Sequence, residues 1–226
     1  AVLSHDMKTP LSAIRLYAQL MQRSPDIPHE RRVHMLETIL HSEKALTNMV
    51  MDIVEIERMQ LGHKPTLTYK HYDFPRMLEA ISATLRPAAE KKAIALTVVP
   101  SAAPILMYGD EARLQRVFEN LLSNAVKYTP EGGRVHVWTT HDEEQIKICV
   151  MDTGYGIPEN DLEHIFDPYH RVKENEKHAI GTGLGLAIVK GFIDMHGGSI
   201  EVKSEVGAGS QFEVTLPLHG LPTLYQ

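Results

Sequence analysis

Gly181-Thr182-Gly183-Leu184-Gly185-Leu186-Ala187-Ile188-Val189-Lys190 is the stretch that decides how the rest of the chain is interpreted. Three glycines alternate along a predicted loop, and a helical run follows at once. Because glycine has no Cβ, backbone N–H groups in such a loop can approach an anion closely. The N-terminus of the following helix adds unpaired N–H groups and the positive end of its dipole. The stretch therefore predicts a phosphate site, and its alternative is a tightly packed turn.

The spacing of these glycines excludes two other phosphate-binding motifs. They run G-x-G-x-G, whereas the dinucleotide-binding fingerprint needs G-x-G-x-x-G. The Gly-Lys-Ser/Thr sequence of a P-loop does not follow them. The phosphate hypothesis therefore depends on partner residues elsewhere in the chain.

Composition limits the classes of function that the chain can have. Its 226 residues suggest one or two domains, and a hydrophobic fraction of 43% is enough for a packed core. A net charge of -6 argues against nucleic acid as a partner. A single cysteine excludes an internal disulfide and fits a reducing compartment. Because no apolar run reaches the roughly 18 residues of a membrane span, we expect a cytoplasmic chain without direct membrane contact.

Two helical patterns occupy residues 1 to about 62. Apolar residues recur at intervals of three and four from residue 1 to about 24 and from about 28 to 61, with a Ser/Pro/Asp turn between them. Pro10 is expected to bend the first helix. The first helix has no N-cap before Ala1, so we expect it to start upstream, and a membrane anchor in that missing region stays open. The apolar stripes comprise Leu3, Met7, Leu11, Ile14, Ala18 and Met21, and then Val33, Leu36, Ile39, Leu40, Leu46, Met49, Val50, Ile53 and Ile56.

The two stripes of such a hairpin cannot bury one another completely. A second copy of the chain would complete a four-helix bundle, so the pattern predicts a homodimer. The alternative is that the stripes pack on the rest of this chain, and the length of the second helix argues against it.

Beyond a linker at residues 62–65, the chain reads as an α+β domain over residues 66–218, with a sheet covered on one face by helices. Predicted strands lie at residues 66–72, 93–99, 105–108, 135–140, 145–151, 199–204 and 211–216. Predicted helices lie at residues 74–91, 110–127 and 183–196, with Pro87 expected to disturb the end of the first.

Polar residues interrupt the apolar helix that ends at Lys127. Asn120 and Asn124 are four residues apart, so both side chains share one face. Their amide oxygens could reach a hydrated Mg²⁺ and the phosphates it carries, and Lys127 could reach the same anion. For an isolated pair of asparagines, a solvated polar stripe is the competing interpretation.

An acidic residue stands where the predicted strand at 145–151 ends. Asp152 is followed by Gly154 and Gly156. A carboxylate in that place suits an exocyclic amine donor lying against the backbone, and an ordinary Asx-type turn is the alternative.

Together these motifs resemble those of the sensor histidine kinases of two-component signalling, over nearly the whole chain. The matching segments, in family order, are the H box at Leu3–Leu11, the N box at Asn120–Tyr128, the first glycine box at Asp152–Pro158, the F box at Ile165–Arg171, the second glycine box at Gly181–Leu186 and the third at Gly209–Phe212.

The resemblance implies a dimerisation and histidine phosphotransfer domain at residues 1–62, forming a dimeric four-helix bundle. It implies a catalytic ATP-binding domain at residues 66–218, an α/β sandwich with a mixed sheet covered by helices, of the type shared with gyrase and heat-shock chaperone ATPases. By resemblance, Asp152 would bind the adenine amino group, Asn124 would ligate Mg²⁺ beside Asn120, and Arg171 would reach the γ-phosphate of ATP. The remaining nucleotide-binding positions would be Lys127, Tyr128, Gly154, Gly156, Ile157, Phe166, Gly181, Thr182, Gly183, Leu184, Gly185 and Leu186.

The sequence departs from the family pattern at three places. Lys8 stands where arginine is usual, Pro168 where the F box commonly has arginine, and Ile180 where many members have a further glycine. The last two lie in the segment 167–180, which the resemblance implies is a lid over the nucleotide.

The implied reaction is autophosphorylation of His5, followed by transfer to an aspartate on the receiver domain of a response regulator. A neutral imidazole has one free nitrogen, and Asp6 could accept the Nδ1–H so that Nε2 attacks, with Asn120 as a further catalytic residue. The run from His5 to Thr9 also resembles family members that dephosphorylate their partner, in which this threonine is thought to position a water.

Two other functions compete with this interpretation. An ATPase of the same fold that uses water would need a carboxylate one turn before the metal-binding asparagine, where this chain has Asn120. A non-enzymatic dimerisation scaffold would not need the full set of motifs. The stimulus, the identity of the regulator, the balance of kinase and phosphatase activity, and phosphorylation in cis or in trans stay open.

Overall fold

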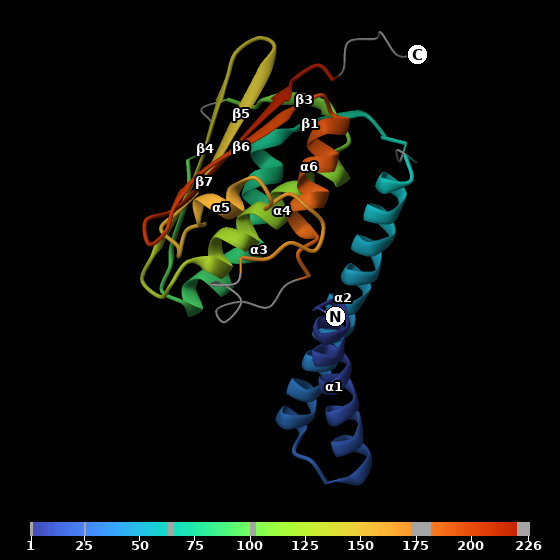
Figure 1. Ribbon diagram of the computed structural model, residues 1–226. Helices are drawn as coiled ribbons and strands as arrows, with labels where there is room; N and C mark the ends of the chain where they lie inside the picture. Colours follow the sequence, from blue (N-terminus) through green and yellow to red (C-terminus); the bar gives the residue numbers. More distant parts are fainter. Residues whose placement is uncertain (1, 25, 63–65, 100–102, 173–181, 221–226) are drawn as a thin grey trace.

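The computed structural model describes residues 2–24, 26–62, 66–99, 103–172 and 182–220, with side chains from Asp6 onward. An N-terminal helical hairpin, α1 (Val2–Arg23) and α2 (His29–Gln60), extends away from the rest of the chain (Figure 1). Pro10 lies inside α1, and the helix continues through it as one element.

The second part of the chain has the predicted α+β composition. Its elements are β1 (Lys70–Asp73), α3 (Phe74–Lys91), β2 (Ala95–Val98), β3 (Leu106–Gly109), α4 (Glu111–Tyr128), β4 (Arg134–His141), β5 (Gln145–Asp152), α5 (Glu159–Leu162), α6 (Gly185–Met195), β6 (Ser199–Glu205) and β7 (Gly209–Pro217).

The main sheet has five strands in the order β2-β4-β5-β7-β6. It is mixed, because β2 pairs with β4 in parallel whereas the other neighbours are antiparallel. β1 and β3 form a separate antiparallel pair. Helices α3, α4 and α6 lie over one face of the main sheet (Figure 1). The core fills the space between them, where Phe74, Phe118 and Phe192 are fully buried.

Both ends of α4 are capped, which fixes the helix that bears Asn120 and Asn124. Asp110 accepts a hydrogen bond at Oδ1 from the backbone N–H of Arg113 (3.1 Å). At the other end, the ammonium group of Lys92 donates to the carbonyls of Val126 and Lys127, both at 2.9 Å, and to that of Thr129. Such side chains satisfy backbone groups that a helix end leaves unpaired.

Some predicted element bounds were wrong for local reasons. The strand expected from residue 66 begins at Lys70, because the N–H of Thr68 donates to the Asp110 carboxylate (2.8 Å) instead of to a strand. The helix expected from Gly183 begins at Gly185, since Gly183 has a φ of 70°. α3 continues past Pro87 to Lys91, because a proline removes only one backbone donor from the helix.

The C-terminal half of α2 packs against α6 and forms ion pairs with α4, which joins the hairpin to the sheet domain (Figure 1). Arg113 on α4 forms an ion pair with Glu55 at 3.0 Å, and Arg116 forms one with Asp52. Burial raises the pKa of Asp52, although the Arg116 guanidinium acts in the opposite direction. Both carboxylates are largely removed from water, and the cost of this desolvation offsets much of the attraction within each pair. The two pairs therefore contribute more to the geometry with which α2 docks on the sheet domain than to the stability of that contact.

Candidate functional site

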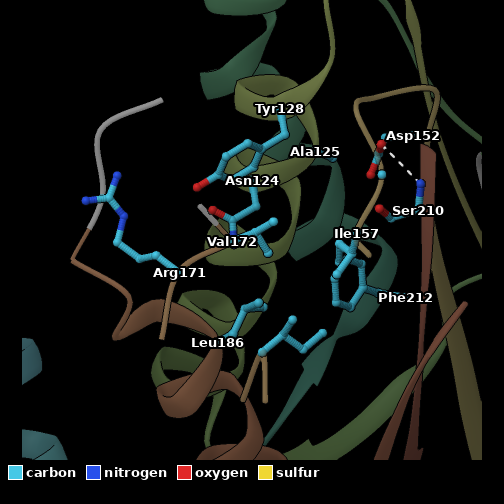
Figure 2. Close-up of a pocket in the computed structure, with 12 residues that line it drawn as sticks. Asn124, Ala125, Tyr128, Asp152, Ile157, Arg171, Val172, Leu186, Ser210 and Phe212 are labelled. Carbon is cyan, nitrogen blue, oxygen red and sulfur yellow. Dashed lines mark hydrogen bonds between the residues drawn. The ribbon is translucent and has the colours of Figure 1, made fainter. Parts of the chain in front are cut away.

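Two adjoining cavities border α4, and they share Asn124, Tyr128, Ile165, Arg171 and Leu186. The first lies within the sheet domain, and the second lies between that domain and α2. The first cavity is also lined by Ala125, Asp152, Gly156, Ile157, Val172, Ser210 and Phe212 (Figure 2). The second is also lined by His41, Ala45, Asp52, Asn120, Ser123, Lys127, Thr182, Gly183 and Gly185.

Asp152 lies at the inner end of the first cavity, where β5 ends. Its Oδ1 accepts hydrogen bonds from the backbone N–H groups of Gly154 (2.8 Å) and Ser210 (3.3 Å), and Figure 2 shows the second of these. The residue is 7% exposed. Burial raises the pKa of this carboxyl to about 6, and the two backbone hydrogen bonds oppose that rise. A buried acceptor of this kind suits a neutral N–H donor.

The glycines beyond Asp152 are required by close contacts. A Cβ on Gly154 would lie 2.6 Å from both Asp152 Oδ1 and the carbonyl oxygen of Tyr128. Gly156 has a φ of 74°, and a Cβ there would lie 2.0 Å from the carbonyl oxygen of Glu205. Larger residues at either position would displace the loop that holds the carboxylate.

The face of α4 that carries both asparagines borders the second cavity. Asn120 donates from Nδ2 to the carbonyl of Arg116 at 2.9 Å. Its Oδ1 would lie 2.8 Å from a Cβ on Gly185, so the first residue of α6 must be small. Asn124 borders both cavities. The pair therefore stands where α4 faces the start of α6.

Positive charge gathers at the junction of the two cavities. Burial, together with the nearby Arg171, lowers the pKa of Lys127 to about 8, and Asp6 acts in the opposite direction. Arg171 Nη1 lies 3.6 Å from Asp6 Oδ2. A partly buried lysine and a guanidinium in one place form a site for an anion.

The structure brings most of the sequence-predicted site residues to these two cavities. Gly154 contributes its backbone N–H to Asp152, Phe166 packs against the hydrophobic core and Leu184 is fully buried, so none of these three lines the cavities. Gly181 and the side chain of His5 lie outside the described residues. Thr9 is exposed on α1.

Sequence reasoning missed several lining residues. Ser210 and Phe212 fall inside the third glycine box, so that motif held a signal for them. His41, Ala45 and Asp52 come from α2, and no pattern in the sequence indicates that this helix reaches the cavity.

Comparisons with known proteins agree with this geometry. Residues 1–62 match the family model of the His Kinase A (phospho-acceptor) domain. Residues 109–220 match the model described as Histidine kinase-, DNA gyrase B-, and HSP90-like ATPase. The chain belongs to the sensor histidine kinase family. This histidine kinase contains segments of both family domains, in the order that the sequence motifs predicted.

Among curated relatives, the histidine protein kinase DivJ of Caulobacter vibrioides is 32% identical over 96% of this chain and 36% of its own length. The autoinducer 2 sensor kinase/phosphatase LuxQ of Vibrio cholerae is 32% identical over 96% of this chain and 26% of its own length. This histidine kinase chain therefore spans about a third or less of these relatives. The solved structure of full-length ShkA in complex with AMPPNP superposes with a TM-score of 0.71 and 27% identity, covering 99% of this chain and 46% of that one.

Within the described residues of this histidine kinase, no helix is both long enough and apolar enough to cross a bilayer.

Proposed function

We propose that the chain is the catalytic core of a sensor histidine kinase, with a phosphotransfer unit at residues 1–62 and an ATP-binding unit at residues 66–218. The observation that supports this most directly is the ion pair between Asp6 and Arg171. It joins the residue next to the proposed phosphoacceptor, His5, to a cation at the edge of the proposed nucleotide cavity.

The residues of the first cavity fit an adenine base. Asp152 offers a buried acceptor for the exocyclic amino group, and Ile157 and Phe212 offer apolar walls (Figure 2). Gly154 and Gly156 leave no room for a Cβ in the loop behind it. The second cavity fits the phosphates, because Lys127 and Arg171 border it together with Thr182 and Gly183. We propose that Asn124 ligates the accompanying Mg²⁺ and that Asn120 stands beside it, since amide oxygens are suitable ligands for that ion.

Bound ATP supplies the γ-phosphoryl group that His5 accepts. Asp6 accepts the Nδ1–H of the His5 imidazole, so that Nε2 keeps its free electron pair for the attack on phosphorus. Arg171 and Lys127 neutralise negative charge on the oxygens around that phosphorus. The N–P bond forms as the bond to the ADP oxygen breaks, and the Nδ1 proton is held against Asp6.

A water-using ATPase is less well supported. Asn120 occupies the place of the carboxylate base, and its amide is held by the Arg116 carbonyl. Glu119 borders a separate groove between α3 and α4, where it accepts a hydrogen bond from Gln115 (2.8 Å). The carboxylate that does border the second cavity, Asp52, belongs to α2 and is paired with Arg116.

We propose that the chain acts as a homodimer through α1 and α2. Leu11, Leu36, Leu40 and Val50 belong to the predicted apolar stripes, and each is more than 40% exposed in the single chain. So much exposed apolar surface on one hairpin is typical of a contact with another molecule. A second copy would bury these residues in a four-helix bundle.

The phosphoryl group of His5 is proposed to pass to an aspartate on the receiver domain of a response regulator, in the cytoplasm. The name of the similar LuxQ describes a sensor kinase/phosphatase. We therefore propose Thr9, one helical turn after His5 and exposed, as the residue that positions a water for removal of phosphate from the regulator.

Incubation with γ-labelled ATP and Mg²⁺ tests the proposed function. We expect label on the protein that is lost in acid and kept in base, as a phosphohistidine requires, and no such label on His5→Gln. The His5→Gln variant should bind ATP as the wild type does, which separates a lost acceptor from a lost fold. Release of free phosphate without labelled protein would instead indicate an ATPase, and the absence of nucleotide binding would indicate a scaffold.

A further inference from the structure

The segment from Asp161 to His170 forms a series of consecutive turns. The N–H of His164 donates to the Asp161 carbonyl (2.9 Å), that of Asp167 to the His164 carbonyl (2.8 Å), and that of His170 to the Asp167 carbonyl (3.2 Å). Each hydrogen bond spans three residues, so the chain coils like successive tight turns. As a result, residues nine apart in sequence come together.

A histidine–carboxylate pair closes this coil. His170 Nε2 lies 2.9 Å from Asp161 Oδ1, and the two side chains are 26% and 24% exposed. A pair that is largely withdrawn from water holds its geometry better than one at the surface, where solvent competes for both groups. The pair thus ties the end of α5 to the residue that directly precedes Arg171.

The backbone of Tyr169, which precedes His170, is held by Gly183 of the second glycine box. The N–H of Tyr169 donates to the Gly183 carbonyl at 2.9 Å. Tyr169 and Gly183 both have left-handed conformations, with φ of 68° and 70°. A Cβ on Gly183 would lie 2.7 Å from the carbonyl oxygen of His170, so the two backbones are in direct contact. A tyrosine keeps such a φ only where its surroundings hold it.

Two contacts therefore hold the backbone directly before Arg171, one made by the side chain of His170 and one by the N–H of Tyr169. Its side chain is 15% exposed, borders both cavities and reaches Asp6. A guanidinium on a long side chain can point in many directions, and a fixed backbone reduces how many of them are populated. The bond from His170 to Asp161 is the part of this arrangement made by side chains alone, so it can be removed without changing the glycine box.

We propose that Asp161 and His170 are positioning residues that aim Arg171 at the γ-phosphate of ATP. This inference rests on the proposed function, in which Arg171 contacts that phosphate. Neither residue borders the two cavities, so they act through Arg171 and do not touch the nucleotide themselves. Their removal should affect ATP, which has a γ-phosphate, and spare ADP, which lacks one.

The test compares His170→Leu and Asp161→Ala with the wild type. Each variant should lose between about tenfold and about a hundredfold in autophosphorylation rate at saturating ATP, as expected for a misplaced charged group. The ratio of ATP affinity to ADP affinity should fall, while ADP affinity and the melting temperature stay at the wild-type values. Parallel losses for ATP and ADP, or wild-type rates, would overturn the proposal.

Two further variants separate positioning from packing. His170→Gln keeps an N–H donor at the reach of Nε2, so it should recover most of the activity that His170→Leu loses, and failure to recover would contradict the inference. Asp167→Ala is the matched control for Asp161→Ala. Asp167 makes the same kind of pair with His164 at 2.9 Å, but its side chain is 62% exposed, so this variant should behave as the wild type.

Arg171→Ala distinguishes a failed inference from a failed function. If Arg171→Ala leaves the ratio of ATP to ADP affinity unchanged, the assignment of Arg171 to the γ-phosphate is wrong. If Arg171→Ala lowers the ratio and Asp161→Ala does not, only the positioning role is wrong. In the double variant Asp161→Ala/Arg171→Ala, we expect no loss beyond that of Arg171→Ala, because the first residue acts through the second. Additive losses would count against the proposal.

Discussion

Arg171 and Asp6 form an ion pair within one chain, with Nη1 and Oδ2 3.6 Å apart. Arg171 belongs to the ATP-binding part and Asp6 to the helix that carries His5, so the proposed nucleotide cavity of a chain faces the proposed phosphoacceptor helix of the same chain. Both side chains are largely buried, at 15% and 3% exposure. The contact is therefore a packed one between two parts of the molecule, and it bears on which subunit of a dimer phosphorylates which.

We expect autophosphorylation in cis. Heterodimers of His5→Gln and Asn124→Asp, purified through two different tags, combine one chain without an acceptor and one chain without a working nucleotide site. If each chain phosphorylates itself, these heterodimers should take up no label from γ-labelled ATP. A heterodimer of the wild type with the double variant His5→Gln/Asn124→Asp should be labelled on the wild-type chain and serves as the control. Label on the Asn124→Asp chain would mean phosphorylation in trans.

Asp152→Asn should stabilise the nucleotide-free protein while weakening ATP binding. Burial raises the pKa of the carboxyl to about 6 from its ordinary value of 3.8, so the folded state holds its proton more tightly than the unfolded state. The stability that this proton contributes is fully present below pH 3.8 and is lost as the pH rises through 6, a loss of about 3 kcal/mol.

Thermal unfolding with and without ATP checks this expectation. At pH 7.5 the Asn variant should melt at a higher temperature than the wild type when no nucleotide is bound, and ATP should raise the melting temperature less in the variant than in the wild type. At pH 4 the difference between the nucleotide-free proteins should largely disappear. A variant that melts lower at pH 7.5 would show that the carboxylate supports the fold.

His196 should make the fold sensitive to acid. The residue is 1% exposed, its Nδ1 donates to the Phe192 carbonyl (2.7 Å), and its Nε2 accepts from the N–H of Asp110 (3.2 Å). Burial lowers the pKa of the imidazole, so the unfolded state binds the proton more tightly. Stability is therefore lost as the pH falls below 6.5, the ordinary pKa of a histidine.

Urea unfolding between pH 7.5 and pH 5 tests the role of His196. His196→Gln keeps an acceptor for Asp110 and cannot take up a proton, so its stability should fall less than that of the wild type over this range. The comparison must use the difference between the two proteins, since Asp152 changes stability in the opposite direction over an overlapping range. Equal pH dependence in both proteins would contradict the prediction.

Thr9→Ala should separate the two proposed activities on α1. The side chain is exposed, so its loss should leave the fold and the autophosphorylation of His5 unchanged. Removal of phosphate from a phosphorylated regulator should fall, because no hydroxyl remains to position a water. Thr9→Ser restores the hydroxyl and is the control. Equal loss of both activities would indicate a structural role for Thr9.

The helices and much of the lining of the two cavities could be predicted from sequence because their signals are local. The apolar periodicity of α4 fixed the face on which Asn120 and Asn124 lie, and Asp152 was marked by the strand that precedes it. The length of α2 argued against packing of its apolar stripe on the rest of the chain, and this was wrong for its C-terminal end, where Ile53 and Ile56 pack in the core of the sheet domain. Asp52 and His41 look like ordinary polar positions on a solvated helix until tertiary packing places them beside the second cavity.

Contacts between residues far apart in the sequence were the other feature that could not be predicted. The parallel pairing of β2 with β4 depends on contacts between segments far apart in the chain, for which a single sequence has no signal. His170 and Asp161 likewise contact each other only because the turns between them repeat every three residues.

The two ion pairs on α2 fix the position of this helix along its axis relative to the ATP-binding part. Asp52 and Glu55 are one turn apart and face Arg116 and Arg113. Sliding α2 by one turn in one direction would set Arg58 against Arg113, and in the other it would leave Arg116 facing an uncharged position, residue 48 or 49. A twist of α2 about its own axis would break both pairs at once. Because these pairs set the geometry of docking, rotation at the far end of this 32-residue helix would change how the ATP-binding part is oriented on α2.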